Sequence, residues 1–235
     1  MKKFLEKIKI LDATTLKIIA VIIMTIDHTG YVLFDNNYIM RSIGRISMPI
    51  FSFFISEGYI KTKNKKKYLT RLGIFALISE IPFDLAFSEK ISFRHQNIML
   101  TFFLSVIALM IFDIIRGEPK PEDTIHNVPR TFIGIFAVGI IGYFSSWLRA
   151  DYGLNAVVCV FIFYLFKNSK QWFRSLSGTA FLAIRQYHMP YLLSGLAFFP
   201  LAMYNGKKGK GLKWLFYIFY PGHLLIIFLI KKIFF

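Results

Sequence analysis

The sequence predicts an all-α, polytopic integral membrane helical bundle, and three observations favour this fold class. Of the 235 residues, 55% are hydrophobic and 18% aromatic, including 27 phenylalanines, which is more apolar surface than a soluble domain can bury. Several apolar runs approach or reach the roughly 17 to 25 residues that cross a bilayer as a helix. Only short polar segments separate them, so residues 1–235 are expected to form one membrane domain.

About eight apolar runs are the predicted membrane segments. They cover residues 16–34, 43–60, 69–87, 98–115, 131–148, 152–166, 176–204 and 214–231. The first run is too long for the apolar part of a signal peptide and has no small-residue cleavage site, so it is expected to stay in the mature protein. The polar stretch RGEPKPEDTIHNVPR contains three prolines and mixed charges, which predicts a cytoplasmic loop.

Basic clusters between the runs set the predicted orientation. The formal net charge of +16 is spread over short connecting segments rather than along one polar domain, so nucleic acid is not an expected partner. The clusters precede the first run and follow the second, fourth and sixth. By the positive-inside rule, they and the N-terminus lie in the cytoplasm, with the chain in a bacterial-type inner membrane.

The lysines at 207–213 conflict with this orientation. One predicted segment separates them from the cytoplasmic basic residues after the sixth run, so a single crossing would place them on the opposite side of the membrane. That segment, residues 176–204, is unusually long and is interrupted by RQYHMP. Irregular backbone is tolerated at membrane depth where it meets protein or water. The segment is therefore either one helix or a short re-entrant hairpin with RQYHMP at its tip.

Ionisable side chains at membrane depth are the candidate functional residues, because each costs at least ~2.5 kcal/mol to insert unless it has a partner or a function. Counting ~1.5 Å per residue from Leu16 places Asp27 and His28 roughly 17–18 Å into the bilayer. They point about 100° apart, so they cannot form a direct acid–base dyad. His223 and Glu80 fall at a similar depth if the last run also starts in the cytoplasm.

Other polar residues accompany this group, and helix pairing by buried charges is the alternative explanation for any one of them. The second run and the residues just before it carry a polar stripe at helical spacing, formed by Arg41, Arg45, Ser52 and Ser56. A metal site at His28, Asp27 and His223 lacks HxxxH or HxxE spacing, so no metal is expected. Cys159 is the sole cysteine, which excludes an intrachain disulfide and CxxC redox chemistry.

Five motifs in order resemble one known family. They are LKIIAVIIMTIDHTGYVLF, MRSIGRISMPIFSFFISEGYIKTKNKKKYLTRLGIFALISEIPFDLAF, DYG, YNGKKG and FYIFYPGHLLI. Together they are similar to the TraX family, whose name-giving member acetylates the N-terminus of F-type conjugative pilin, and which resembles the larger group of transmembrane acyltransferases. The likeness runs through most of the chain. Glu80 departs from it, because the family's ISQ motif has glutamine at this position.

The resemblance implies transfer of an acetyl group from cytoplasmic acetyl-CoA to an amine, with a peptide or protein N-terminus as the expected acceptor. A protonated amine cannot attack a thioester, so the site needs a base, and His28 is the expected one. Arg45, or His223 as a donor, is expected to stabilise the oxyanion. Asp27 is expected either to orient His28 through another residue or a water molecule, or to receive the acceptor ammonium before it loses its proton. Direct transfer and an acetyl-histidine intermediate both remain open.

Coenzyme A is a polyanion, so the basic segments KTKNKKKY and YNGKKGKG are expected to meet its phosphates, with orientation charge as the alternative explanation. The expected cofactor-binding residues are Lys66, Lys67, Arg71, Tyr204, Asn205, Gly206, Lys207 and Lys208. The expected substrate-binding residues are Arg41, Glu57, Glu80, Asp84, Asn97, Asp151 and Tyr152. Further candidates for an outer funnel are Arg94, Arg185 and His188.

Two other functions suit an apolar chain with buried charges. A transporter or flippase would use them for ions or substrate, although the inverted repeats typical of that class are not recognisable here. An assembly or anchoring component would use them to hold helices together. The expected partners are membrane lipid and the acceptor amine, and the sequence predicts no oligomeric state.

Overall fold

The computed structural model describes residues 9–117, 124–185 and 192–234, and this part of the chain is helical, which confirms the all-α prediction. The elements are α2 (Ala13–Val32), α3 (Tyr38–Gly44), α4 (Ser47–Lys61), α5 (Lys65–Ser88), α6 (Ile98–Arg116), α7 (Thr124–Trp147), α8 (Gly153–Leu165), α9 (Gln171–Arg185), the 3₁₀ helix η1 (Leu193–Ala197), α11 (Phe198–Ala202) and α12 (Lys213–Phe234). Each of the predicted apolar runs contains helix.

Four helices in the described residues are long and apolar enough to cross a membrane. They are α2, α6, the Val128–Trp147 part of α7, and the Trp214–Phe234 part of α12. The outward side chains of α7 are large and apolar, and most are exposed, including Phe132, Phe136, Tyr143 and Trp147. Such a surface is stable against lipid rather than water, as expected for a multi-pass membrane protein.

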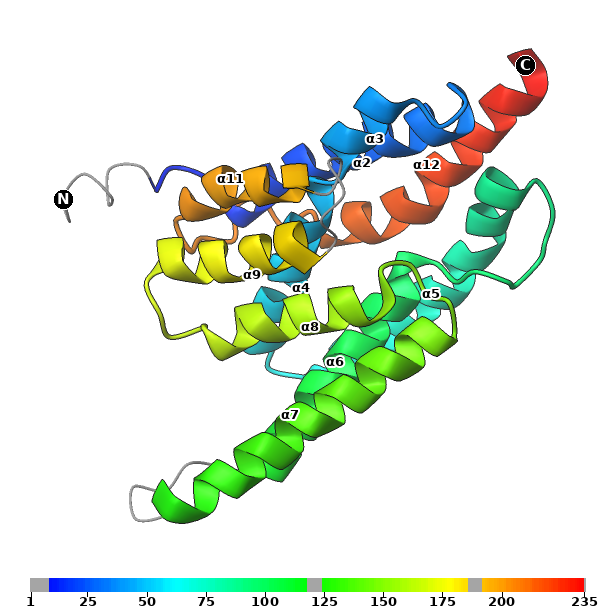
Figure 1. Cartoon of the computed structure of the whole chain (residues 1–235). Coiled ribbons are helices and arrows are strands. Elements are labelled where there is room, and N and C mark those ends of the chain that lie inside the picture. Colours follow the sequence, from blue (N-terminus) through cyan, green and yellow to red (C-terminus); the bar gives the residue numbers. More distant parts are fainter. Residues whose placement is uncertain (1–8, 118–123, 186–191, 235) are drawn as a thin grey trace.

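The helices lie lengthwise beside one another, so loops gather at the two ends of the bundle (Figure 1). The last helix, α12, packs against both α2 and α5, whereas α6 contacts α5, α7 and α8. The start of α2 and the start of α12 lie at the same end, and α12 finishes at the opposite one (Figure 1). The first and last helices therefore run side by side.

Residues 176–204 form a hairpin rather than one helix. The first arm, α9, packs against both η1 and α11 of the second arm. The chain then returns to the start of α2, where Leu11 N donates to Met203 O at 3.1 Å and Ala13 N donates to Lys207 O at 2.9 Å. The lysines that follow thus lie at the same end as the first helix, which removes the conflict in the alternation of basic clusters. Most of RQYHMP lies outside the described residues.

Two predicted boundaries were wrong. The run at 43–60 is divided into α3 and α4 by a turn at Arg45 and Ile46, so its polar stripe is shared between two helices. The expected loop at 116–130 is shorter, because α7 already begins at Thr124 and includes Pro129. Val128, Pro129 and Arg130 of this extension are exposed. α7 follows α6 closely further along, where a Cβ added to Gly134 would lie 2.8 Å from Cδ2 of Phe112.

Candidate active site

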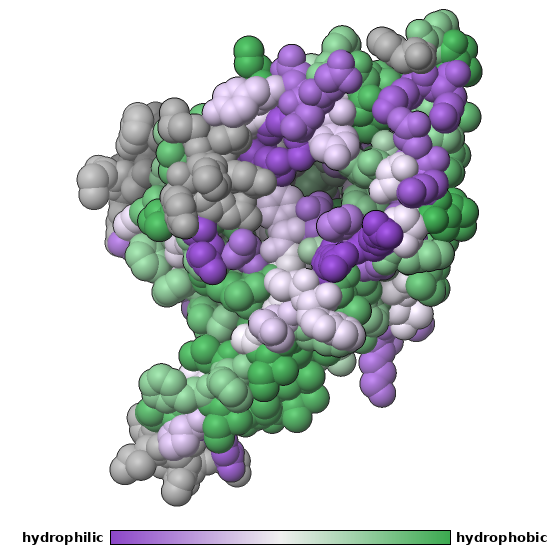
Figure 2. Space-filling view, turned by 45° about the vertical axis from the view of Figure 1, so that its right-hand side comes forward, coloured by the Kyte–Doolittle hydropathy of each residue, from purple (hydrophilic) through white to green (hydrophobic). Residues whose placement is uncertain are grey.

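A cavity of about 760 Å³, the main cavity, extends between the helices from the basic loops to the opposite end of the bundle. Lys17, Lys61 and Lys208 line it at the first end, and Arg41 and Asp151 line it at the second. Its middle is mostly apolar, with contributions from Met24, Phe51, Phe83 and Phe87. Figure 2 shows a hollow of this kind on one face, bordered by hydrophilic residues.

Two imidazoles from the first and last helices meet beside this cavity. Nδ1 of His28 lies 2.6 Å from Nε2 of His223, and the rings stack with centroids 4.9 Å apart. Both residues are buried, at 9% and 5% exposure. His28 lines the cavity, whereas His223 lies behind it. The structure thus brings together two residues that the sequence places at a similar depth.

The backbone of α12 fixes the direction of this hydrogen bond. Nδ1 of His223 lies 2.8 Å from the carbonyl oxygen of Phe219, which can only accept, so His223 carries its proton on Nδ1. Its Nε2 is then an acceptor, and Nδ1 of His28 must donate to it. Nε2 of His28 therefore keeps its lone pair, and a neutral imidazole with a free lone pair lines the cavity.

Asp27 does not contact His28 and instead fixes an arginine. Its Oδ1 lies 3.0 Å from a terminal nitrogen of Arg41. The carboxylate packs on α3 at Gly44, where an added Cβ would be 2.2 Å from Cβ of Asp27. A guanidinium nitrogen of Arg45 donates to the hydroxyl of Tyr152 at 2.8 Å. All of these polar side chains line the main cavity at one end.

Three residues at this end were missed by the sequence analysis: His95, Gln96 and Arg149 also line the cavity. Their backbones are joined, since Gln96 N donates to Arg149 O at 3.1 Å. The unusual polar segment between the third and fourth runs was the available signal for His95 and Gln96.

At the opposite end, some of the predicted cofactor-binding residues line the cavity and others do not. Arg71, Tyr204 and Lys208 line it. Asn205, Gly206 and Lys207 belong to the same loop as Tyr204, whereas Lys66 and Lys67 are exposed and do not line the cavity.

Lys17 and Lys61 also line the cavity. Lys61 belongs to the predicted segment KTKNKKKY, whereas Lys17 was missed. The ammonium of Lys17 lies 5.0 Å from the ring centre of Phe54 and 5.5 Å from that of Phe216. Lys17 shares a helical face with His28, eleven positions later, so the spacing along α2 contained this signal.

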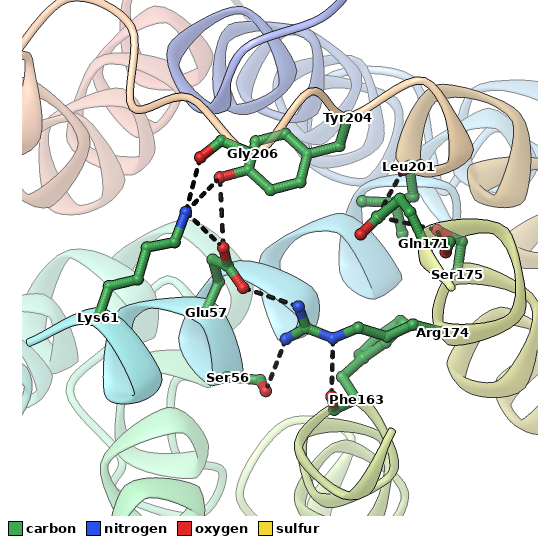
Figure 3. Close-up of polar contacts among 10 residues, drawn as sticks. All are labelled: Ser56, Glu57, Lys61, Phe163, Gln171, Arg174, Ser175, Leu201, Tyr204 and Gly206. Carbon is green, nitrogen blue, oxygen red and sulfur yellow. Dashed lines mark hydrogen bonds and ion pairs between the residues drawn. The ribbon is translucent and has the colours of Figure 1, made fainter. Parts of the chain in front are cut away.

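Glu57 is held by two cations (Figure 3). Its Oε1 lies 2.7 Å from Nζ of Lys61, and its Oε2 lies 2.7 Å from a terminal nitrogen of Arg174. Arg174 also donates to Phe163 O at 2.8 Å, and Lys61 to Gly206 O at 2.7 Å. Glu57 therefore joins α4 to α8, α9 and the loop after α11, which is a structural contact at the cavity wall.

Three predicted substrate-binding residues, Glu80, Asp84 and Asn97, do not line the main cavity. The side-chain amide of Asn97 donates to Glu80 Oε2, and its carbonyl caps α6 by accepting from Met99 N at 3.0 Å. Asp84 Oδ2 accepts from Ser92 N at 2.9 Å. These bonds hold the segment before α6 against α5, and so position His95 and Gln96.

Three further candidates remain, and the structure describes two of them. Arg94 and Arg185 are exposed and do not line it, and His188 lies outside the described residues. Within residues 9–117, 124–185 and 192–234, no group of three His, Cys, Asp or Glu side chains is arranged to hold a metal.

Comparison with known proteins identifies the family. The chain is 30% identical over 244 residues to the probable fimbrial assembly protein FimC, serogroup H1, of Dichelobacter nodosus, and the alignment covers 92% of this chain and 94% of that protein. It is 31% identical over 158 residues to the uncharacterized protein RP591 of Rickettsia prowazekii (strain Madrid E), covering 66% of this chain and 56% of that protein. No solved structure matches it. The family model described as TraX protein matches residues 12–231, and the chain therefore belongs to the TraX family.

Proposed function

We propose that this protein transfers an acetyl group from cytoplasmic acetyl-CoA to an amine, with the N-terminus of a peptide or protein as acceptor. The observation that carries the proposal is the hydrogen-bonded series from His28 through His223 to Phe219 O. It presents an imidazole lone pair on the wall of a cavity that has cations at both ends. Membership of a family linked to pilin acetylation supports the same chemistry.

In the proposed reaction, His28 acts as the general base. The acceptor enters as a neutral amine after losing a proton, and its nitrogen attacks the thioester carbonyl. His28 Nε2 takes the second proton as the C–N bond forms, and the imidazolium returns it to the sulfur when the C–S bond breaks. His223 helps because it accepts from Nδ1 of His28, which orients the ring and stabilises the charged form. Atoms balance as an N-acetyl amide and free CoA.

The arginines at the end of the cavity opposite to the basic loops are suited to stabilise the negative charge that forms during the reaction. The tetrahedral intermediate carries a negative oxygen, which is stabilised by fixed positive charge in a cavity shielded from water. Arg45 is held by Tyr152 and is the candidate for this role. Asp27 positions Arg41, while Asp151 lines the same end without an ion pair among the described residues and is the candidate to receive the acceptor ammonium.

The end of the main cavity near the basic loops has the positive charge needed to bind coenzyme A. Lys17, Arg71 and Lys208 line the cavity and would meet its phosphates. Lys17 and His28 are separated by about 17 Å along α2, a distance that an extended pantetheine arm can cover. The thioester would then reach His28 while the nucleotide stays at the basic end.

This arrangement favours a bacterial inner membrane with about eight membrane segments, the hairpin at 176–204 being re-entrant. The basic loops and the start of α2 would face the cytoplasm, by the positive-inside rule. The first arm of the hairpin, α9, has 15 residues and is about 22 Å long, which is shorter than the hydrocarbon layer of a typical bilayer.

The acceptor can be identified in cells that contain or lack the protein. Peptides from both should be compared by mass spectrometry for acetylated N-termini, beginning with subunits of surface fibres, as the name of the Dichelobacter relative suggests. The purified protein should then release CoA from labelled acetyl-CoA in the presence of that peptide. His28→Ala should lower the rate of release about 10²–10⁴-fold, whereas Lys66→Ala should not change it. Ion flux into liposomes without acetyl transfer would instead indicate a transporter.

A further inference from the structure

A second cavity of about 370 Å³, the side pocket, adjoins the main cavity at its basic end. The two share Glu57 and Lys61 as lining residues, so this ion pair stands between them. The other charged residues that line the side pocket are Lys65, Lys167 and Arg174. It therefore lies where a ligand of the main cavity could extend toward the cytoplasm.

Cations outnumber acids in and around the side pocket. Four cations line it, namely Lys61, Lys65, Lys167 and Arg174. In the part of the chain that the structure describes, two carboxylates neutralise them. Glu57 is paired with Lys61 and Arg174, and Asp113 is paired with Lys65 at 2.9 Å. Two positive charges are left in excess, which favours a doubly charged anion.

The wall of the side pocket is already ordered without a ligand. The hydroxyls of Tyr59 and Tyr164 both donate to Asp113, the first at 2.6 Å. Lys65 donates to the same carboxylate and to the Tyr59 hydroxyl at 2.9 Å. These bonds fix the two tyrosines and one lysine, so a ligand would meet a preformed surface.

Lys167 is the cation with unused donors. Its ammonium lies 3.8 Å from the ring centre of Tyr164 and makes no hydrogen bond or ion pair with the described residues. Partial burial lowers the pKa of Lys167 from its ordinary value, because the charged form loses water. An anion bound here would offset this loss through its charge and up to three hydrogen bonds.

We propose that the side pocket binds a phosphate monoester, with Lys167 as the main ligand and Lys65 beside it. Resting on the function proposed above, the phosphate is the 3′-phosphate of coenzyme A. The nucleotide would lie across the Glu57–Lys61 pair, and the pantetheine arm would enter the main cavity. This assigns a role to Lys167, which belongs to the basic cluster after the sixth run and was not among the expected cofactor-binding residues.

Adenosine 3′,5′-bisphosphate and AMP, which lacks the 3′-phosphate, should be titrated calorimetrically into the whole protein in phosphatidylcholine nanodiscs. The wild type should bind the bisphosphate more tightly. Lys167→Ala should weaken bisphosphate binding about tenfold, as expected for one charge-assisted hydrogen bond partly open to water, and should leave AMP binding unchanged. Lys167→Arg should retain the preference.

Lys170→Ala is the matched control, because Lys170 is exposed at the same end and does not line the side pocket. Equal losses in the two alanine variants, or no preference in the wild type, would overturn the proposal. Competition by phosphatidic acid in the nanodisc, with loss of lipid binding in Lys167→Ala, would show that the phosphate belongs to a lipid headgroup. The titration needs no acetyl transfer, so an inactive protein with an intact preference would refute only the proposed function.

Discussion

The hydrogen bond between His28 and His223 predicts a graded effect of substitutions at residue 223. In His223→Leu, the Nδ1–H of His28 loses its acceptor inside a buried site. An unsatisfied buried donor costs about 1–3 kcal/mol, which corresponds to a roughly 5- to 150-fold lower rate if the cost falls on the transition state. His223→Gln keeps an acceptor near the same place, so its loss should be smaller. His28→Ala should cost about 10²–10⁴-fold, the usual contribution of a general base.

The assay is the initial rate of acetyl-peptide formation in nanodiscs at saturating acetyl-CoA, with the thermal unfolding midpoint of each variant as a control for folding. The expected order of rates is wild type, then Gln, then Leu at position 223. Gln and Leu variants that fold normally and are equally active would refute the reasoning, because the acceptor at Nε2 would then contribute nothing. A normal rate in His28→Ala would remove His28 from the mechanism.

Three further predictions concern stability, measured by unfolding in mixed detergent–SDS micelles. Arg174→Ala should destabilise the fold by about 3 kcal/mol, because Glu57 stays buried with one cation fewer; an unchanged midpoint would show that the pair is dispensable. Gly44→Ala should cost about 1–3 kcal/mol, since the added methyl group overlaps the aspartate of α2, whereas Gly139→Ala, with no atom within 4 Å of its added Cβ, should cost nothing. Glu80→Gln should change stability by less than about 0.5 kcal/mol, because it keeps the acceptor for the buried asparagine amide. Glu80→Leu should cost about 1–3 kcal/mol, and equal midpoints for the two would contradict this explanation.

Much of the fold could be predicted from the apolar runs and the basic clusters. The first are needed to cross the hydrocarbon of the membrane, and the second set the orientation of the helices. The division between α3 and α4 could not be predicted. The length of the apolar run indicates a helix, and nothing in its sequence indicates a turn at Arg45. The extended start of α7 was also missed, because its prolines indicate a loop. Val128, Pro129 and Arg130 are exposed, so burial does not explain the early start of the helix. The hairpin at 176–204 was recognisable from the conflict in orientation that a single helix creates.

The part of the candidate site that depends only on depth in the membrane could be predicted. His28 and His223 meet because two helices that start at one end carry them at similar heights. Depth does not reveal partners, however, so Glu57 was assigned to substrate although it pairs with Arg174. Arg174 itself was counted as an orientation charge, and only its tertiary contacts show that it is buried.

The bond between the imidazoles joins residues 195 positions apart in the chain. Translation and membrane insertion must therefore reach the final helix before the two rings can meet. A nascent or prematurely terminated chain would hold His28 without the acceptor at Nε2 of His223. The proposed base would therefore gain its hydrogen-bond partner only after the helix that carries His223 has entered the membrane.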